Sequence, residues 1–110
     1  MTRLPTHLEV GGWIRQVQHA GGFATLINRG EKDAGTVIIL TTCRGKNSAL
    51  WERMPQLDGS RKFVETRHEE AENPAEFMGY IQRRIAQDPD LWVLEIDHED
   101  SRELFQSLVN

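Results

Sequence analysis

The densest group of potential metal ligands in the chain is the run Asp-His-Glu-Asp at residues 97–100. Carboxylate and imidazole groups bind metal ions, but consecutive side chains on an extended chain point to opposite sides and seldom converge on one ion. The other histidines, His7, His19 and His68, are scattered, and none has the short spacing to a second histidine or cysteine that zinc sites use. We therefore expect a solvated acidic turn and no metal site.

A loop bounded by glycines at residues 30 and 35 carries three charged side chains, Glu31, Lys32 and Asp33. It lacks the Gly-x-x-x-x-Gly-Lys-Ser/Thr pattern of a phosphate-binding loop, and no helix follows it to offer an N-terminus. The simplest interpretation is a hairpin turn in which glycine supplies a positive φ. A small-ligand site at the three charged side chains is the alternative, because binding residues are often found on loops.

An aromatic residue among arginines is the third candidate. Trp51 lies close in sequence to Arg53, and Arg61 and Arg67 lie in the next predicted strand. On an open face of a sheet, these four side chains would form an interaction surface suited to a protein partner, a second copy of the chain or single-stranded nucleic acid. The other two tryptophans fall on core patterns and are expected to pack in the interior.

Two single residues have chemistry of their own. Glu95 is a carboxylate in the otherwise apolar segment 91–96, and a buried carboxylate needs a partner or a raised pKa. Cys43 is the only cysteine, so an internal disulfide is excluded. We interpret it as a small strand residue. The alternative is a reactive thiol with a pKa lowered by Arg44, although nothing nearby supplies a general base.

The composition fits one compact domain, residues 1–110, with 38% hydrophobic and 27% charged residues. The formal net charge of −4 disfavours general attraction to nucleic acid or anionic membranes. The charge is uneven, because residues 44–68 hold six basic and three acidic side chains, whereas residues 69–110 hold three and eleven. No apolar run approaches the roughly 18 residues needed to cross a bilayer, and the first five residues lack signal-peptide character, so a cytoplasmic location is expected.

Two helices are expected from end signals and apolar stripes. Thr6 and Glu9 have the spacing of a capping box, in which the glutamate amide donates to the threonine hydroxyl. A first helix is therefore predicted over residues 6–20, before a glycine pair that supplies a left-handed stop. A second helix is predicted from Pro74, a residue suited to the first turn, to the residue before Pro89.

Five segments rich in β-branched and apolar residues are expected to be strands. They are residues 23–29, 36–44, 49–54, 61–67 and 91–96. The short loops between the first four favour an antiparallel meander. The last strand, which arrives through the second helix, is expected beside the first in the order 5-1-2-3-4, by a right-handed crossover.

The expected fold class is therefore α+β, with the element order α-β-β-β-β-α-β. It is a two-layer domain whose four- to five-stranded, mainly antiparallel sheet carries two helices on one face. Residues 100–109 either add a short C-terminal helix or fray. This arrangement would leave the second face of the sheet open.

Four groups of residues, taken together in their order and spacing, form a specific pattern. They are Arg3-Leu4 with Thr6-His7, Gln18-x-Ala20-Gly21-Gly22-Phe23-Ala24, Arg29-Gly30 with Asp33-Ala34-Gly35, and the run from Asp88-Pro89-Asp90 to Ile96. In this pattern the chain resembles a family of small alphaproteobacterial proteins, the domain-of-unknown-function family 1491. The resemblance implies a single-domain intracellular bacterial protein and supplies no catalytic residues.

These observations favour a small non-enzymatic interaction module over an enzyme, because the chain has no nucleophile–base pair and no nucleotide motif. We expect it to form a homodimer through the open sheet face or an edge strand, or to bind a protein partner. One alternative is a small-ligand-binding protein or enzyme that uses the loop at residues 30–35. The other is RNA binding through the basic segment 44–68. No cofactor, metal or membrane partner is expected.

Overall fold

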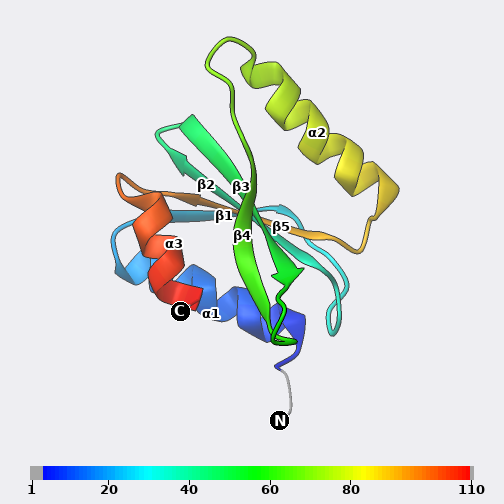
Figure 1. The fold of residues 1–110 in the computed structure, drawn as a ribbon. Coiled ribbons are helices and arrows are strands. Elements are labelled where there is room, and N and C mark those ends of the chain that lie inside the picture. Colours follow the sequence, from blue (N-terminus) through cyan, green and yellow to red (C-terminus); the bar gives the residue numbers. More distant parts are fainter. Residues whose placement is uncertain (1–3, 110) are drawn as a thin grey trace.

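The computed structural model describes residues 4–109, which form a five-stranded sheet and three helices (Figure 1). The elements in chain order are α1 (Thr6–His19), β1 (Phe23–Asn28), β2 (Val37–Cys43), β3 (Lys46–Pro55), β4 (Arg61–His68), α2 (Pro74–Gln87), β5 (Trp92–Asp97) and α3 (Ser101–Val109). The α+β class and the predicted element order are confirmed, and the C-terminal segment forms a helix instead of fraying.

The order of the strands differs from the expected 5-1-2-3-4. The sheet has the order β1-β5-β2-β3-β4, so β5 lies between the two strands that were expected to form the first hairpin. It pairs antiparallel with β1 and parallel with β2, which makes the sheet mixed. The physical reason is burial: Trp92, Val93 and Leu94 are at most 1% exposed. Such a continuous apolar run is most stable where both faces of a strand are covered.

The helices cover both faces of the sheet, whereas two helices on a single face were expected (Figure 1). Side chains of α1 and α3 pack on one face and side chains of α2 on the other. The strand β2 shows the division most clearly, because Val37 and Ile39 belong to the α1–α3 core and Ile38 and Leu40 to the α2 core. Neither face is left open along the centre of the sheet.

The helix α2 is tied to the sheet by polar contacts as well as by its apolar stripe. Arg84 donates from Nη1 to Glu52 of β3 at 2.9 Å and to the hydroxyl of Tyr80 at 2.8 Å. Burial of Arg84 lowers its pKa, but the hydrogen bonds with Tyr80 and Glu52 outweigh this effect and raise the pKa above its ordinary value. Thr66 of β4 donates to the same glutamate at 2.6 Å. This cluster joins α2, β3 and β4.

None of the helices in the part of the chain that the structure describes is long and apolar enough to cross a membrane.

Candidate functional site

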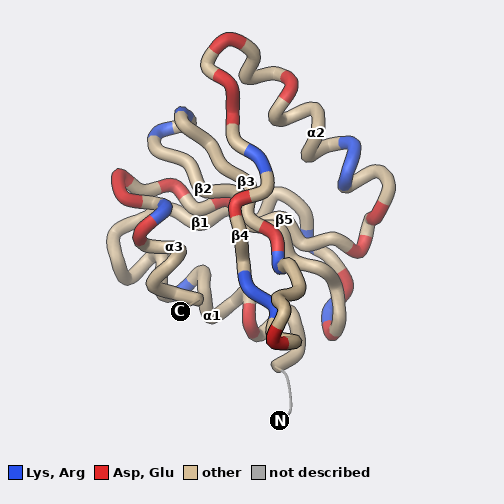
Figure 2. The backbone as a smooth tube through the Cα atoms, in the orientation of Figure 1, with Lys and Arg blue, Asp and Glu red and all other residues tan. Residues whose placement is uncertain are grey.

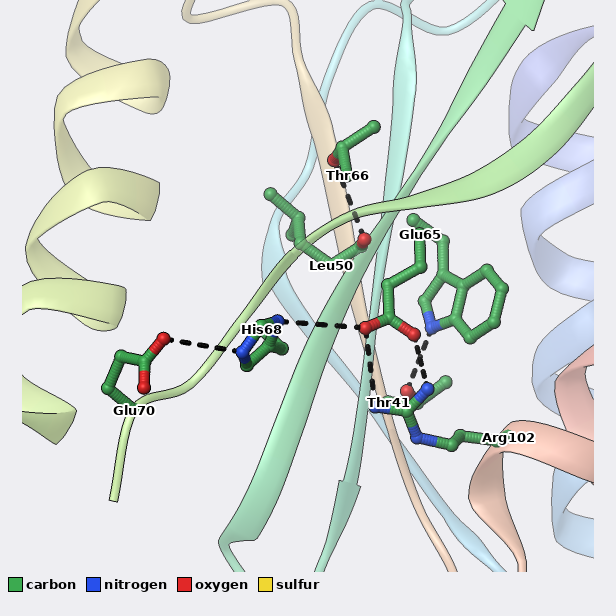
Figure 3. Close-up of polar contacts among 8 residues, drawn as sticks. Thr41, Leu50, Glu65, Thr66, His68, Glu70 and Arg102 are labelled. Carbon is green, nitrogen blue, oxygen red and sulfur yellow. Dashed lines mark hydrogen bonds and ion pairs between the residues drawn. The ribbon is translucent and has the colours of Figure 1, made fainter. Parts of the chain in front are cut away.

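The structure contradicts the expected position of Trp51 on an open face. Its side chain is only 6% exposed, and its ring lies 5.5 Å from that of Phe105 in α3. The indole N–H donates to the Thr41 hydroxyl at 2.9 Å, which satisfies the only polar atom of the ring (Figure 3). Trp51 is therefore a core residue, because the C-terminal helix covers the part of the sheet on which it stands.

Arg53, on the same face two residues further along β3, has surroundings suited to binding. Its guanidinium group lies 2.6 Å from the Glu9 carboxylate of α1. It also lies 5.6 Å from the ring centre of Trp13 and 4.9 Å from that of Phe63, where cation–π attraction holds it. The two rings meet edge to face at 5.8 Å, so they form a fixed aromatic wall beside the charge.

These residues line a hollow that we call the basic cleft. It has a volume of about 720 Å³ and lies between α1, the end of α3 and the hairpin of β3 and β4. Its walls carry both charged and apolar groups, as do many binding sites. The lining residues are Glu9, Trp13, Arg53, Ser60, Arg61, Lys62, Phe63, Leu108 and Val109.

Positive charge dominates the basic cleft. Three cations, Arg53, Arg61 and Lys62, line it together with a single carboxylate, that of Glu9. Within residues 4–109, neither Arg61 nor Lys62 forms an ion pair. Lys62 alternates with Phe63 along β4, so its side chain is directed to the other face of the sheet. An anionic group entering the cleft would therefore meet one cation, Arg61, that has no carboxylate partner.

The turn before β4 holds the basic wall of the cleft in place. Asp58 accepts hydrogen bonds from the hydroxyl and the amide of Ser60, at 2.6 and 2.9 Å. These bonds lower the pKa of the Asp58 carboxyl, which therefore keeps its charge well into the acidic range. Gly59 adopts a positive φ of 86° between them, which glycine tolerates without strain.

Arg67 does not join the basic cleft. It lies on the opposite face of the sheet, where its guanidinium group stacks 3.7 Å from the ring centre of Tyr80 in α2. Of the four residues expected to share one interaction surface, the structure therefore brings together Arg53 and Arg61 only. The bulge in the pairing of β3 with β4, between Leu50 and Trp51, changes the alternation of side chains and contributes to this separation.

The loop at residues 30–35 has a structural role that its sequence did not reveal. The carbonyl of Glu31 accepts a hydrogen bond from the Trp92 indole at 2.6 Å, and its carboxylate accepts bonds from the amides of Asp33 and Ala34. The carbonyls of Lys32 and Asp33 accept bonds from the first free amides of α1. The loop therefore fixes β5 and α1. The expected hairpin turn is wrong, because β5 lies between β1 and β2, and neither Gly30 nor Gly35 adopts a positive φ.

The predicted capping box at the start of α1 is wrong, because the loop at residues 30–35 takes the place of a cap. The Thr6 hydroxyl donates to the carbonyls of Asp33 and Gly35, at 3.3 and 3.4 Å, and makes no capping bond to its own helix. The Glu9 carboxylate, which in a capping box would accept from the Thr6 amide, is paired with Arg53 instead. A neighbouring loop thus replaces the local cap and frees Glu9 for the basic cleft.

Glu95 lies on the α2 face of the sheet, between Thr25 of β1 and Leu40 of β2 in the strand register. It is partly buried, and it has no hydrogen bond or ion pair within residues 4–109. Burial, with a smaller contribution from the charge of Asp97, raises the pKa of its carboxyl. Glu95 is therefore a partly buried carboxyl with a raised pKa and no partner for its charge within residues 4–109.

The acidic residues after β5 are engaged in local structure. Asp97 accepts a hydrogen bond from the Arg44 amide at 2.8 Å, and Glu99 pairs with the Arg44 side chain at 3.1 Å. His98 accepts a bond from the Asp100 amide. Across residues 4–109, no three His, Cys, Asp or Glu side chains lie in positions to hold a metal ion.

A chain of polar contacts that the sequence did not indicate joins α3 to the end of β4 (Figure 3). Glu65 pairs with Arg102 of α3 through both of its oxygens. His68 lies between two acids, 4.0 Å from Glu65 and 3.3 Å from Glu70. The pair of Glu65 with Arg102 joins β4 to α3, and the Arg102 guanidinium lies 5.9 Å from the ring centre of the buried Trp51.

Comparisons with known proteins agree with this fold. The chain matches a family model described as a protein of unknown function, DUF1491, over residues 4–106. It is 29% identical to a DUF1491 family protein from Caulobacter crescentus CB15 in its crystal structure, with 93% of this chain and 94% of that chain covered and a TM-score of 0.79. An NMR structure of a DUF1491 family protein from the same organism is 28% identical, with 94% of each chain covered and a TM-score of 0.76. The solution structure of protein Atu0922 from A. tumefaciens is also 28% identical, with 94% of this chain and 92% of that chain covered and a TM-score of 0.69. No curated protein matches the chain.

Proposed function

The chain belongs to the DUF1491 family, whose function is unknown, and we propose that this member is a small non-enzymatic interaction module. In this proposal the basic cleft receives an acidic segment of a partner protein. The module works by binding alone, with the sheet and helices as a rigid frame for the cleft.

One observation carries the proposal: a cleft of about 720 Å³ combines an aromatic wall with Arg53 and with a second cation, Arg61, that has no carboxylate partner in residues 4–109. Aromatic and arginine side chains supply most of the binding energy at protein interfaces. A charged rim further accelerates encounter with a partner of opposite sign. The protein as a whole is acidic, with a net charge of −4. The basic cleft is therefore a local region of opposite sign, which directs an acidic partner to this part of the surface.

The distribution of charge argues against RNA binding through segment 44–68. Figure 2 shows its basic residues separated over the molecule, at the turn between β2 and β3 and at both ends of β4. Arg44 is paired with Glu99 and Arg67 is stacked on Tyr80 on the other face from Arg53. A continuous basic track that could follow a phosphate backbone is not formed by these residues.

The proposal is tested by reversing charge in the cleft. The variant Arg61→Glu is expected to lose binding to an acidic peptide, because it reverses the charge of the cleft cation that has no carboxylate partner. The matched control, Lys32→Glu, changes the net charge equally at an exposed position outside the cleft. Isothermal titration calorimetry compares the two. Equal affinity in both variants would mean that the cleft is not the binding site.

Self-association is a second candidate, supported by the composition of the sheet edges. The edge strand β1, Phe-Ala-Thr-Leu-Ile-Asn, has no charged residue, and its Phe23 is 74% exposed. The other edge, β4, is rich in charge. Charged residues on an edge strand prevent pairing with another chain, so β1 is the edge that can pair with a second copy.

Light scattering after gel filtration tests this candidate. Thr25→Lys places a charge on the exposed middle of β1 and is expected to convert a dimer into a monomer. Leu57→Lys, at the fully exposed tip of the hairpin between β3 and β4, is the matched control and should leave the dimer intact. A wild-type protein that stays monomeric at millimolar concentration would remove the candidate.

A further inference from the structure

The position of Glu9 in the basic cleft has a consequence for what the cleft binds. The Arg53 guanidinium has two aromatic rings beside it and one carboxylate against it, and its side chain is 19% exposed. Because Trp13 and Phe63 are uncharged, Glu9 is the one anion that Arg53 contacts within residues 4–109. The carboxylate of Glu9 therefore stands where an anionic group of a ligand would bind most strongly.

We propose that the cleft binds an acidic peptide segment whose carboxylate replaces Glu9 on Arg53, so that Glu9 is a built-in competitor. This inference rests on the proposed function of the cleft. It specifies the chemistry of the partner, which is a carboxylate next to an aliphatic side chain. Leu108 and Val109 form the apolar wall that would accept the aliphatic group.

Glu9 is able to leave Arg53 at small cost. It lies in the first turn of α1, where the positive end of the helix dipole stabilises a carboxylate whether or not Arg53 is its partner. Its side chain is 28% exposed, so rotation into water restores its hydration. The pair with Arg53 is the only ion pair that Glu9 forms in residues 4–109, so no other pair is broken when it leaves.

An incoming carboxylate has more partners in the cleft than Glu9 has. Glu9 is carried by the backbone of α1, and within residues 4–109 its ion pair is with Arg53. A peptide that enters the cleft is free to place a carboxylate between Arg53 and Arg61, the cation of the cleft without an ion-pair partner in that range. Charge-assisted hydrogen bonds to arginine are among the strongest polar contacts in proteins, so this difference favours exchange.

The central test is Glu9→Gln, which keeps the size of the side chain and removes the competing charge. We expect this variant to bind an acidic peptide about two- to fivefold more tightly, the range expected for the loss of a partly exposed ion pair. The matched control is Glu72→Gln, which removes one negative charge from an exposed position in the loop before α2. It should change the affinity by less than the Glu9 variant does.

The experiment is calorimetric titration of the whole protein with the blocked peptide acetyl-Leu-Glu-Leu-Glu-Leu-amide. The same peptide with glutamine in place of glutamate and a short RNA oligonucleotide serve as comparison ligands. A second variant, Arg53→Met, is expected to weaken binding more than about tenfold, because it removes the charge for which Glu9 and the ligand compete. Circular dichroism confirms that each variant is folded.

The outcomes separate the inference from the function on which it rests. Binding by the wild-type protein that tightens in Glu9→Gln, and not in Glu72→Gln, supports the inference. Binding that is equal or weaker in Glu9→Gln overturns the competitor role and leaves the interaction function standing. No binding by the wild-type protein and by Glu9→Gln overturns both. RNA that binds as tightly as the acidic peptide overturns the assignment of a peptide ligand.

Discussion

Replacing Gly30 by alanine tests the contact between the loop at residues 30–35 and the start of β5. A Cβ atom at this position would lie 2.1 Å from the Asp90 carbonyl oxygen and 2.5 Å from Cδ1 of Trp92. Real side chains essentially never approach backbone atoms so closely, so the loop has to move by about 1 Å. Neither neighbour is able to give way, because Asp90 contributes backbone and Trp92 is 1% exposed.

The expected loss of unfolding free energy follows from the contacts that such a movement breaks. The Glu31 amide donates to the Asp90 carbonyl at 3.0 Å, and the Trp92 indole donates to the Glu31 carbonyl at 2.6 Å. Two hydrogen bonds contribute about 1 kcal/mol each, and overpacking costs a further 1–3 kcal/mol. We therefore expect Gly30→Ala to lower the free energy of unfolding by about 3–5 kcal/mol.

The assay is urea unfolding followed by tryptophan fluorescence, with Gly79→Ala as the matched control. Gly79 lies inside α2, and its Cβ would meet only the flexible end of Arg83 at 3.4 Å. Alanine there is expected to raise the free energy of unfolding by about 0.5–1 kcal/mol, through its higher helix propensity. A Gly30→Ala protein within 1 kcal/mol of the wild type would refute the close approach of the loop to β5.

Three further variants test other parts of the structure. Trp51→Ala is expected to cost about 3–5 kcal/mol of unfolding free energy, measured by urea denaturation, because it empties a buried site; an exposed residue would cost less than 1 kcal/mol. Arg84→Met removes the contacts with Glu52 and Tyr80 and should speed hydrogen exchange of the α2 amides more than of the α1 amides, whereas an equal effect on both helices would contradict the role of this cluster. Glu95 has a raised pKa when folded, so the folded protein holds this proton more tightly and stability falls as pH rises above the ordinary value of 4.5. Glu95→Gln should therefore be more stable than the wild type at pH 7, by less than about 1 kcal/mol because solvent screens the group, and the gain should vanish below pH 4; urea unfolding at both values checks this, and a gain independent of pH would argue against it.

The sequence predicted which segments form strands but not their order in the sheet. The runs 37–40 and 92–94 are continuously apolar, and both proved to be buried on two faces. Their adjacency in the sheet depends on the loop between β1 and β2, which bonds to Asp90 and Trp92 across more than fifty residues of sequence. No local pattern encodes a contact of that kind, whereas a meander of short connections is the simplest local solution.

The candidate site was predictable in part. Arg53 and Arg61 were identified from charge, and the pairing of Arg53 with Phe63 follows from the register of a hairpin that turns at residues 58–59. The role of Trp13 was missed, because its stripe on α1 is typical of any core-facing helix. Trp51 was misplaced because its burial depends on α3, a nine-residue helix that sequence patterns could equally assign to a frayed end.

Chemical-shift mapping tests the central claim, that the basic cleft is the binding site, most directly. Amide and indole signals of the isotope-labelled protein are followed while the blocked Leu-Glu peptide is added. Binding in the basic cleft should concentrate the shifts at the Trp13 indole, at Arg53, at residues 60–63 and at residues 108–109. Shifts confined to β1 or to the α2 face, or no shifts at millimolar peptide, would contradict it.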